Sequence, residues 1–156
     1  MHDETELVDA KRLYFPALAG IYNFGAQLSY AFIRVLVALV FLPSGIDKMF
    51  QGGHARIAEG NIAALGLAPK FAWAWAVAGL EFFGAILFGL GLLTRAVSFA
   101  FVVQLFVITF MIQISNGYFW SSRGFEVGLL LWLIFIAYCF GGGGRYSLDQ
   151  IGRAHV

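Results

Sequence analysis

The sequence predicts an all-α protein, a transmembrane four-helix bundle, and three observations point to that fold class. The 156 residues are 60% hydrophobic and 12% charged, with a mean hydropathy of +0.80, whereas soluble domains carry about 25% charged residues. The twenty residues from Ala96 to Ser115 include no ionisable side chain, and a helix of roughly 20 residues crosses a bilayer. Three similar apolar stretches accompany this one. We therefore expect an integral membrane protein in contact with the lipid bilayer.

The predicted elements follow in order along the chain. Residues 1–27 form an N-terminal tail, either an amphipathic helix lying on the membrane surface or a loosely ordered polar segment. The bundle occupies residues 28–144, and residues 145–156 form a short C-terminal tail. The four spans are expected near residues 28–50, 71–93, 96–115 and 125–141. Only Thr94 and Arg95 separate the second span from the third, so these two helices must be antiparallel neighbours.

Small residues mark the second span as the central helix of the bundle. Burial of apolar surface does not drive helices together in lipid, so close packing and polar contacts must do so. Ala74 and Ala78, and then Ala85 and Gly89, are each four residues apart, which is typical of close helix contacts. Phenylalanines occur in all four spans and are expected first as lipid-facing bulk.

Residue counts exclude several classes of function. The formal net charge of +1 argues against a nucleic-acid partner, and a single cysteine, Cys139, excludes a disulfide within the chain. The three histidines, at positions 2, 54 and 155, fall outside the predicted spans. The spans therefore offer no histidine pair for haem and no Cys/His cluster for zinc or iron–sulfur binding. We expect no metal site and no covalently bound cofactor.

Ionisable residues in the spans carry the information on function. A charge at mid-membrane costs about 2.5–3.5 kcal/mol on insertion scales, so it faces the bundle interior and finds a partner. The candidates are Arg34, Asp47, Lys48, Glu81 and Glu126. Glu81 lies ten residues past Phe71, about 15 Å deep by helical rise, and Lys48 ends the antiparallel first span within its reach. We expect both glutamates and Lys48 to form a polar pocket, with Asp47 at its edge.

The sequence leaves the role of this pocket open. The charges can simply fix helix register, or Glu81 can be a neutral strut that makes hydrogen bonds. The pocket can instead bind a quinone head group or form part of a proton path. Gln104 and Gln113 on the third span can add hydrogen bonds to such a site or serve as helix–helix contacts.

The basic residues of the short loops indicate the orientation. The side that holds both termini carries five of them, Lys11, Arg12, Arg95, Arg145 and Arg153. The other side carries four, Lys48, Arg56, Lys70 and Arg123. This balance leans toward cytoplasmic termini.

Several short motifs lie at the ends and in the middle of the spans. They are Phe41-Leu-Pro-Ser-Gly-Ile-Asp-Lys48, Glu81, Gly91-Leu-Leu-Thr-Arg95, Glu126 and Gly144-Arg-Tyr-Ser-Leu-Asp149. In this order and spacing, over roughly residues 30–150, the chain resembles the DoxX family of small four-helix membrane proteins. The resemblance carries over seven positions: Lys48, Glu81, Thr94, Arg95, Glu126, Arg145 and Asp149. We expect Arg95 and Asp149 to form an ion pair that ties the turn to the tail.

The resemblance also implies a function. It points to a component of a quinone-linked membrane oxidoreductase assembly in the bacterial inner membrane, which supplies an anchor or a quinone pocket while other membrane subunits supply the redox centre. One alternative is a non-catalytic accessory subunit of a larger respiratory or photosynthetic complex. A second alternative is a small-solute carrier with Glu81 as a proton-coupled gate.

Overall fold

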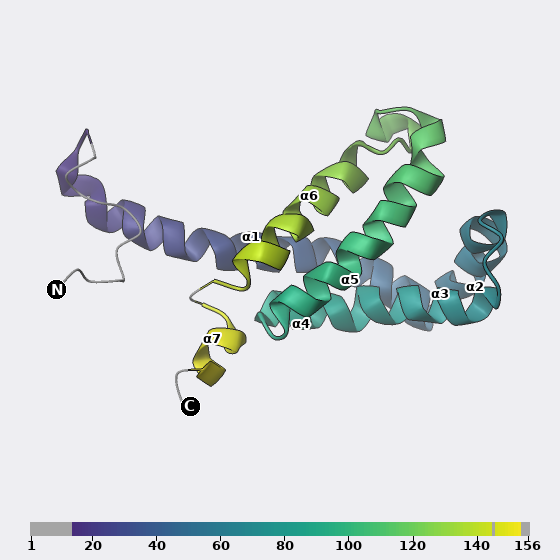
Figure 1. Ribbon diagram of the computed structural model, residues 1–156, viewed down its shortest axis with the longest axis horizontal. Helices are drawn as coiled ribbons and strands as arrows, with labels where there is room; N and C mark the ends of the chain where they lie inside the picture. Colours follow the sequence, from purple (N-terminus) through teal and green to yellow (C-terminus); the bar gives the residue numbers. More distant parts are fainter. Residues whose placement is uncertain (1–13, 145, 154–156) are drawn as a thin grey trace.

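A computed structural model describes residues 14–144 and 146–153, which form helices and contain no strand. Most of the predicted N-terminal tail, residues 1–13, lies outside the described residues, and so does Arg145. Figure 1 shows one long helix, a second helix alongside it and a helical hairpin that crosses both obliquely. The all-helical fold class is confirmed.

The first span is longer than predicted. A 3-10 turn, η2 (Pro16–Leu18), leads into α1 (Ala19–Phe50), a helix of 32 residues. The helix therefore begins nine residues before the predicted start of the span at residue 28. No proline lies between Pro16 and Pro43 to interrupt it.

The second and third spans each combine α-helix with a π-helical segment. The second consists of α3 (Lys70–Gly79), η4 (Leu80–Gly84) and α4 (Ala85–Leu90). The third consists of α5 (Thr94–Phe106), η5 (Val107–Gln113) and the 3-10 turn η6 (Ile114–Asn116). Together with α1, these are the described helices long and apolar enough to cross a membrane.

The fourth span, α6 (Glu126–Gly141), is shorter. Its 16 residues cover about 24 Å by helical rise, and it packs along α5 as an antiparallel partner. A 3-10 turn, η7 (Trp120–Ser122), lies in the loop before it. After it, α7 (Leu148–Arg153) returns to the turn between α4 and α5, where the Asp149 N–H donates to Gly91 O at 3.0 Å (Figure 1).

The predicted loop between the first two spans also contains helix. It forms α2 (Gly53–Ile57) and the π-helical η3 (Ala58–Ile62), which pack beside α1 and α3. This short helical segment lies at the end of the molecule where α1 stops and α3 begins (Figure 1).

Aromatic side chains form the centre of the bundle. The Phe101 ring on α5 stacks on Phe135 of α6 at 4.5 Å, and it contacts Phe41 of α1 at 4.7 Å. Phe88 of α4 completes the group, 4.8 Å from Phe135. The expectation that phenylalanine is lipid-facing bulk is wrong for these four, since each is at most 8% exposed. Ala85 of the second span packs into this core, and Ala74, Ala78 and Ala85 are each at most 1% exposed.

Candidate functional site

Glu81 lies on the π-helical segment η4 at the point where the second span meets α1. The helices touch backbone to backbone there, because a Cβ added to Gly45 would lie 2.6 Å from the Phe82 nitrogen. This close approach brings Lys48, three residues after Gly45, alongside Glu81. Short π-helical segments within α-helices occur frequently at functional sites.

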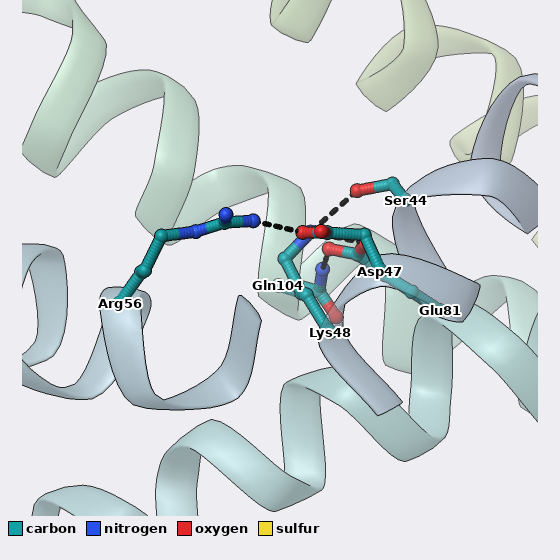
Figure 2. A network of polar contacts seen from close by, with 6 residues as sticks. All are labelled: Ser44, Asp47, Lys48, Arg56, Glu81 and Gln104. Atoms are coloured by element: carbon teal, nitrogen blue, oxygen red, sulfur yellow. Dashed lines mark hydrogen bonds and ion pairs between the residues drawn. The ribbon is translucent and has the colours of Figure 1, made fainter. Parts of the chain in front are cut away.

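Two neighbouring helices, α1 and α5, contribute side chains that contact the Glu81 carboxylate (Figure 2). Lys48 Nζ of α1 donates to Glu81 Oε2 at 2.5 Å and to Ser44 Oγ at 2.5 Å. Gln104 Nε2 of α5 donates to Glu81 Oε1 at 2.7 Å. The ion pair expected between Lys48 and Glu81 is therefore present, and Gln104 supplies the further hydrogen bond that its position on the third span suggested.

This cluster retains unused hydrogen-bonding capacity. Gln104 Oε1 is buried and has no partner among the described residues. The Lys48 ammonium carries three donors, and the contacts described for it use two of them. The Lys48 side chain is 15% exposed and that of Glu81 is 4% exposed. A buried acceptor and a donor therefore remain for a further polar group.

A second set of polar contacts lies next to this cluster, where α1 ends and α2 begins. Asp47 forms an ion pair with Arg56 of α2, which places Asp47 at the edge of the site as expected (Figure 2). His54 Nδ1 donates to the Lys48 carbonyl oxygen at 2.8 Å, and the His54 ring stacks on Trp75 with centroids 4.2 Å apart. These contacts join α2 to the end of α1 and to α3.

The structure does not bring Glu126 to this cluster. Its Oε2 atom accepts a hydrogen bond from the Trp120 N–H at 3.0 Å. The loop before α6 folds back on the helix start, where the Glu126 N–H donates to Tyr118 O at 3.0 Å. The carboxylate therefore satisfies a loop amide. Depth along the span predicted a contact between Glu126 and Lys48. Glu126 instead bonds to Trp120, which is only six residues away along the chain.

The turn and the tail are tied together, although not by the predicted ion pair. Asp149 accepts hydrogen bonds from the backbone N–H groups of Leu93 (2.7 Å) and Thr94 (2.8 Å). Arg95 instead donates to Phe140 O at 3.2 Å, and no Arg95–Asp149 salt bridge occurs among the described residues. The start of α5 presents unpaired N–H groups and a partial positive charge, which attract a carboxylate directly.

Arg34 forms a separate polar centre nearer the other end of α1. Its guanidinium is buried and donates to three backbone carbonyls, those of Gly89 (3.1 Å), Tyr146 (2.6 Å) and Gly143. Arg34 therefore holds the chain after α6 against α4 and makes no described contact with Glu81.

The sequence analysis did not place Ser44 or Arg56 among the residues of the polar pocket. Ser44 precedes Lys48 by four residues, a spacing that places both on one helix face, so the sequence held a usable signal. Arg56 carried none, because its contact with Asp47 depends on how the chain turns between α1 and α2.

Comparison with known proteins supports the resemblance to the DoxX family. The DoxX family profile matches residues 29–114, more than half of the chain. An uncharacterized protein of Haemophilus influenzae is 28% identical over 129 residues, 77% of this chain and 87% of the relative. An uncharacterized membrane protein of Mycobacterium tuberculosis is 30% identical over 130 residues, 76% of this chain and 77% of the relative. No solved structure is significantly similar. The chain is a multi-pass integral membrane protein and belongs to the DoxX family.

Proposed function

We propose that the Lys48–Glu81–Gln104 cluster is a quinone head-group site within a quinone-linked membrane oxidoreductase assembly. One observation carries the proposal: a buried carboxylate near the middle of the 21-residue second span sits beside a buried acceptor that has no partner in the described part of the chain. Ionisable groups at this depth are costly and commonly mark functional sites. A purely structural cluster would be expected to satisfy its buried polar atoms.

The side chains fit the chemistry of a quinone. The carbonyl oxygens of the oxidised quinone accept hydrogen bonds, and the remaining Lys48 N–H group can donate one. The hydroxyl groups of the reduced form donate hydrogen bonds, and Gln104 Oε1 can accept one. When bound, a quinone supplies two-electron redox chemistry. In the proposed assembly another membrane subunit provides the redox centre, while this chain binds and orients the ring. Glu81 holds the Lys48 and Gln104 side chains in place for that task.

An apolar groove that begins one helical turn after Glu81 suits the tail of such a ligand. It has a volume of about 270 Å³ and lies between α1 and α4, where Ala38, Ala85 and Gly89 leave space. Ala85 is one helical turn after Glu81. Sites for drug-sized ligands usually span about 300–1,000 Å³, so this groove is suited to a narrow apolar chain rather than to a ring.

The test is binding of a short-chain ubiquinone to the purified chain in nanodiscs. The decisive variant combines Lys48→Met with Glu81→Gln, because it removes both charges together and leaves neither buried alone. We expect it to weaken binding at least about ten-fold, since hydrogen bonds to charged groups contribute about 1.5–3 kcal/mol each. Glu126→Gln is the matched control, because it neutralises a carboxylate outside the cluster. Equal affinity of the wild type and the double variant would refute the proposal.

The same preparations separate the two alternative functions. An accessory subunit would show no quinone binding alone and would co-purify with a larger complex in mild detergent. A carrier would move a solute across liposomes that contain this chain only. For the assembly we infer an inner-membrane location with cytoplasmic termini, which cysteine labelling from each side of the membrane tests.

A further inference from the structure

The α2–η3 segment, Gly53–Ile62, fills a space that α1 leaves open, and we call this segment the plug. Alpha1 ends at Phe50, five residues beyond Gly45, whereas the second span begins at Lys70, eleven residues before Glu81. Since Gly45 lies level with Glu81, a rise of 1.5 Å per residue gives about 7.5 Å of α1 against about 16.5 Å of α3. The plug packs against both helices beyond the end of α1.

Two exposed ion pairs hold the plug at its surface. Arg56 pairs with Asp47, their side chains being 68% and 35% exposed. Lys70 pairs with Glu59 at 2.5 Å, with exposures of 39% and 59%. Ion pairs with this exposure contribute little to stability. His54 adds the stacking contact with Trp75 described above. The plug is therefore held at its surface by contacts that break at low cost.

The apolar contacts of the plug are separate from the main core. Ala58 and Ile62 form a small cluster with Ala74 of α3, whereas the aromatic core lies around Phe101. A segment with its own small cluster can open without loss of the global fold. The plug can therefore leave α3 while the four-helix bundle stays intact.

Glycines flank the plug, and the plug covers Lys48. Gly52 and Gly66 have φ values of +79° and +68°, and a Cβ at either would meet nothing within 4 Å. Their conformation rather than crowding therefore favours glycine at these positions. Gly53, the first residue of the plug, is so close to α1 that a Cβ would lie 2.9 Å from Lys48 Cα. Opening at Gly52 would thus uncover the end of α1 at Lys48.

We propose that the plug is a hinged gate that controls access of water to the Lys48–Glu81 pair from the membrane face at which Lys70 lies. This inference rests on the proposed function in one respect: it takes the Lys48–Glu81 pair as the site that the gate opens to water. The plug and the residues that it contacts carry charged or polar side chains: Glu59, Lys70, Arg56, Asp47 and His54. Such side chains suit water and the protons that it carries, whereas an apolar ligand would reach the cluster from the lipid side.

The native lysines report opening of the gate. The wild-type chain in nanodiscs is treated with a sulfonated amine-reactive ester, which does not enter lipid, and modification at Lys48 and Lys70 is followed by mass spectrometry. We expect Arg56→Ala to raise the rate at Lys48 about two- to five-fold, the range that corresponds to loss of one exposed ion pair. The rate at Lys70 should change little, since its side chain is already 39% exposed with the plug in place. Hydrogen exchange should accelerate in residues 53–62 and not in residues 85–90.

A second variant and a control complete the test. Asp47→Asn should give the same increase, and combining it with Arg56→Ala should add nothing, because both changes remove one interaction. Glu126→Gln should leave both rates as in the wild type. Unchanged Lys48 modification in both plug variants, or exchange in residues 53–62 as slow as in 85–90, would overturn the gate. No quinone enters this assay, so its failure would leave the proposed function standing.

Discussion

Separate and combined removal of the two charges at Lys48 and Glu81 measures how strongly the pair is coupled. Glu81→Gln leaves the lysine ammonium in the bundle interior with Ser44 as its described partner. Lys48→Met leaves the carboxylate with Gln104 alone. Because the side chains are only 15% and 4% exposed, each single change leaves an uncompensated buried charge, which costs about 3–5 kcal/mol.

The double variant should recover most of that loss. Replacing a buried ion pair by neutral groups of similar volume is often neutral or stabilising. Here a glutamine at position 81 keeps an acceptor for Gln104 Nε2. We therefore expect the double variant within about 1 kcal/mol of the wild type, which with the two single losses gives a coupling energy of at least about 5 kcal/mol, more than the roughly 0.5–3 kcal/mol usual for residues in contact.

Thermal unfolding in nanodiscs provides the measurement. For a chain of this size about 2–4 °C corresponds to 1 kcal/mol, so each single variant should unfold about 6–20 °C below the wild type and the double variant near it. Single variants that each lose less than about 1 kcal/mol would show that water solvates the charges. A double variant that loses the sum of both effects would show that the two side chains act independently. Either result would refute the buried-pair reasoning.

Three further substitutions test the packing and the polar contacts at the ends of the bundle. Arg34→Met should lower the unfolding temperature and accelerate hydrogen exchange in residues 141–149, because three carbonyls lose their donor; unchanged exchange would contradict its role as a tie. Asp149→Ala should cost about 0.5–2 kcal/mol through loss of the helix cap, measured by thermal unfolding, and a neutral effect would count against the cap. Gly45→Ala should cost about 1–3 kcal/mol by overpacking against the Phe82 backbone, whereas Gly79→Ala, with open space around it, should cost nothing.

The sequence predicted depth along the membrane better than it predicted direction around each helix. Apolar length and helical rise place Lys48 and Glu81 at compatible depths, because consecutive membrane spans run antiparallel. Rotation is a separate matter, since spans that are apolar on every side give no period that marks an inner face. Phe101 and Phe135 were therefore expected toward lipid and are found stacked in the core.

Local backbone groups account for the errors at the helix ends. Opposite charge predicted that Asp149 would pair with Arg95, but the amides that begin α5 are fixed, partly positive donors. Glu126 similarly binds the N–H of Trp120 in its own loop. Side-chain charges can be read from a sequence, whereas the unpaired amides of a helix start become partners only once the exact turn is known. The contacts of the plug with α1 and α3 were not predicted either, because they depend on the turn at Gly52.

The two buried polar centres differ in a way that decides which of them can serve a ligand. The Arg34 guanidinium donates to backbone carbonyls of α4 and of the chain after α6, and those acceptors cannot turn away without displacing the segments that carry them. The Glu81 cluster is built from side chains on a π-helical segment and two neighbouring helices. Side chains can change rotamer to admit a new partner, and Gln104 Oε1 has no partner to give up. Exchange of hydrogen bonds with a ligand is therefore possible at Glu81 without unfolding, whereas at Arg34 it would open the bundle.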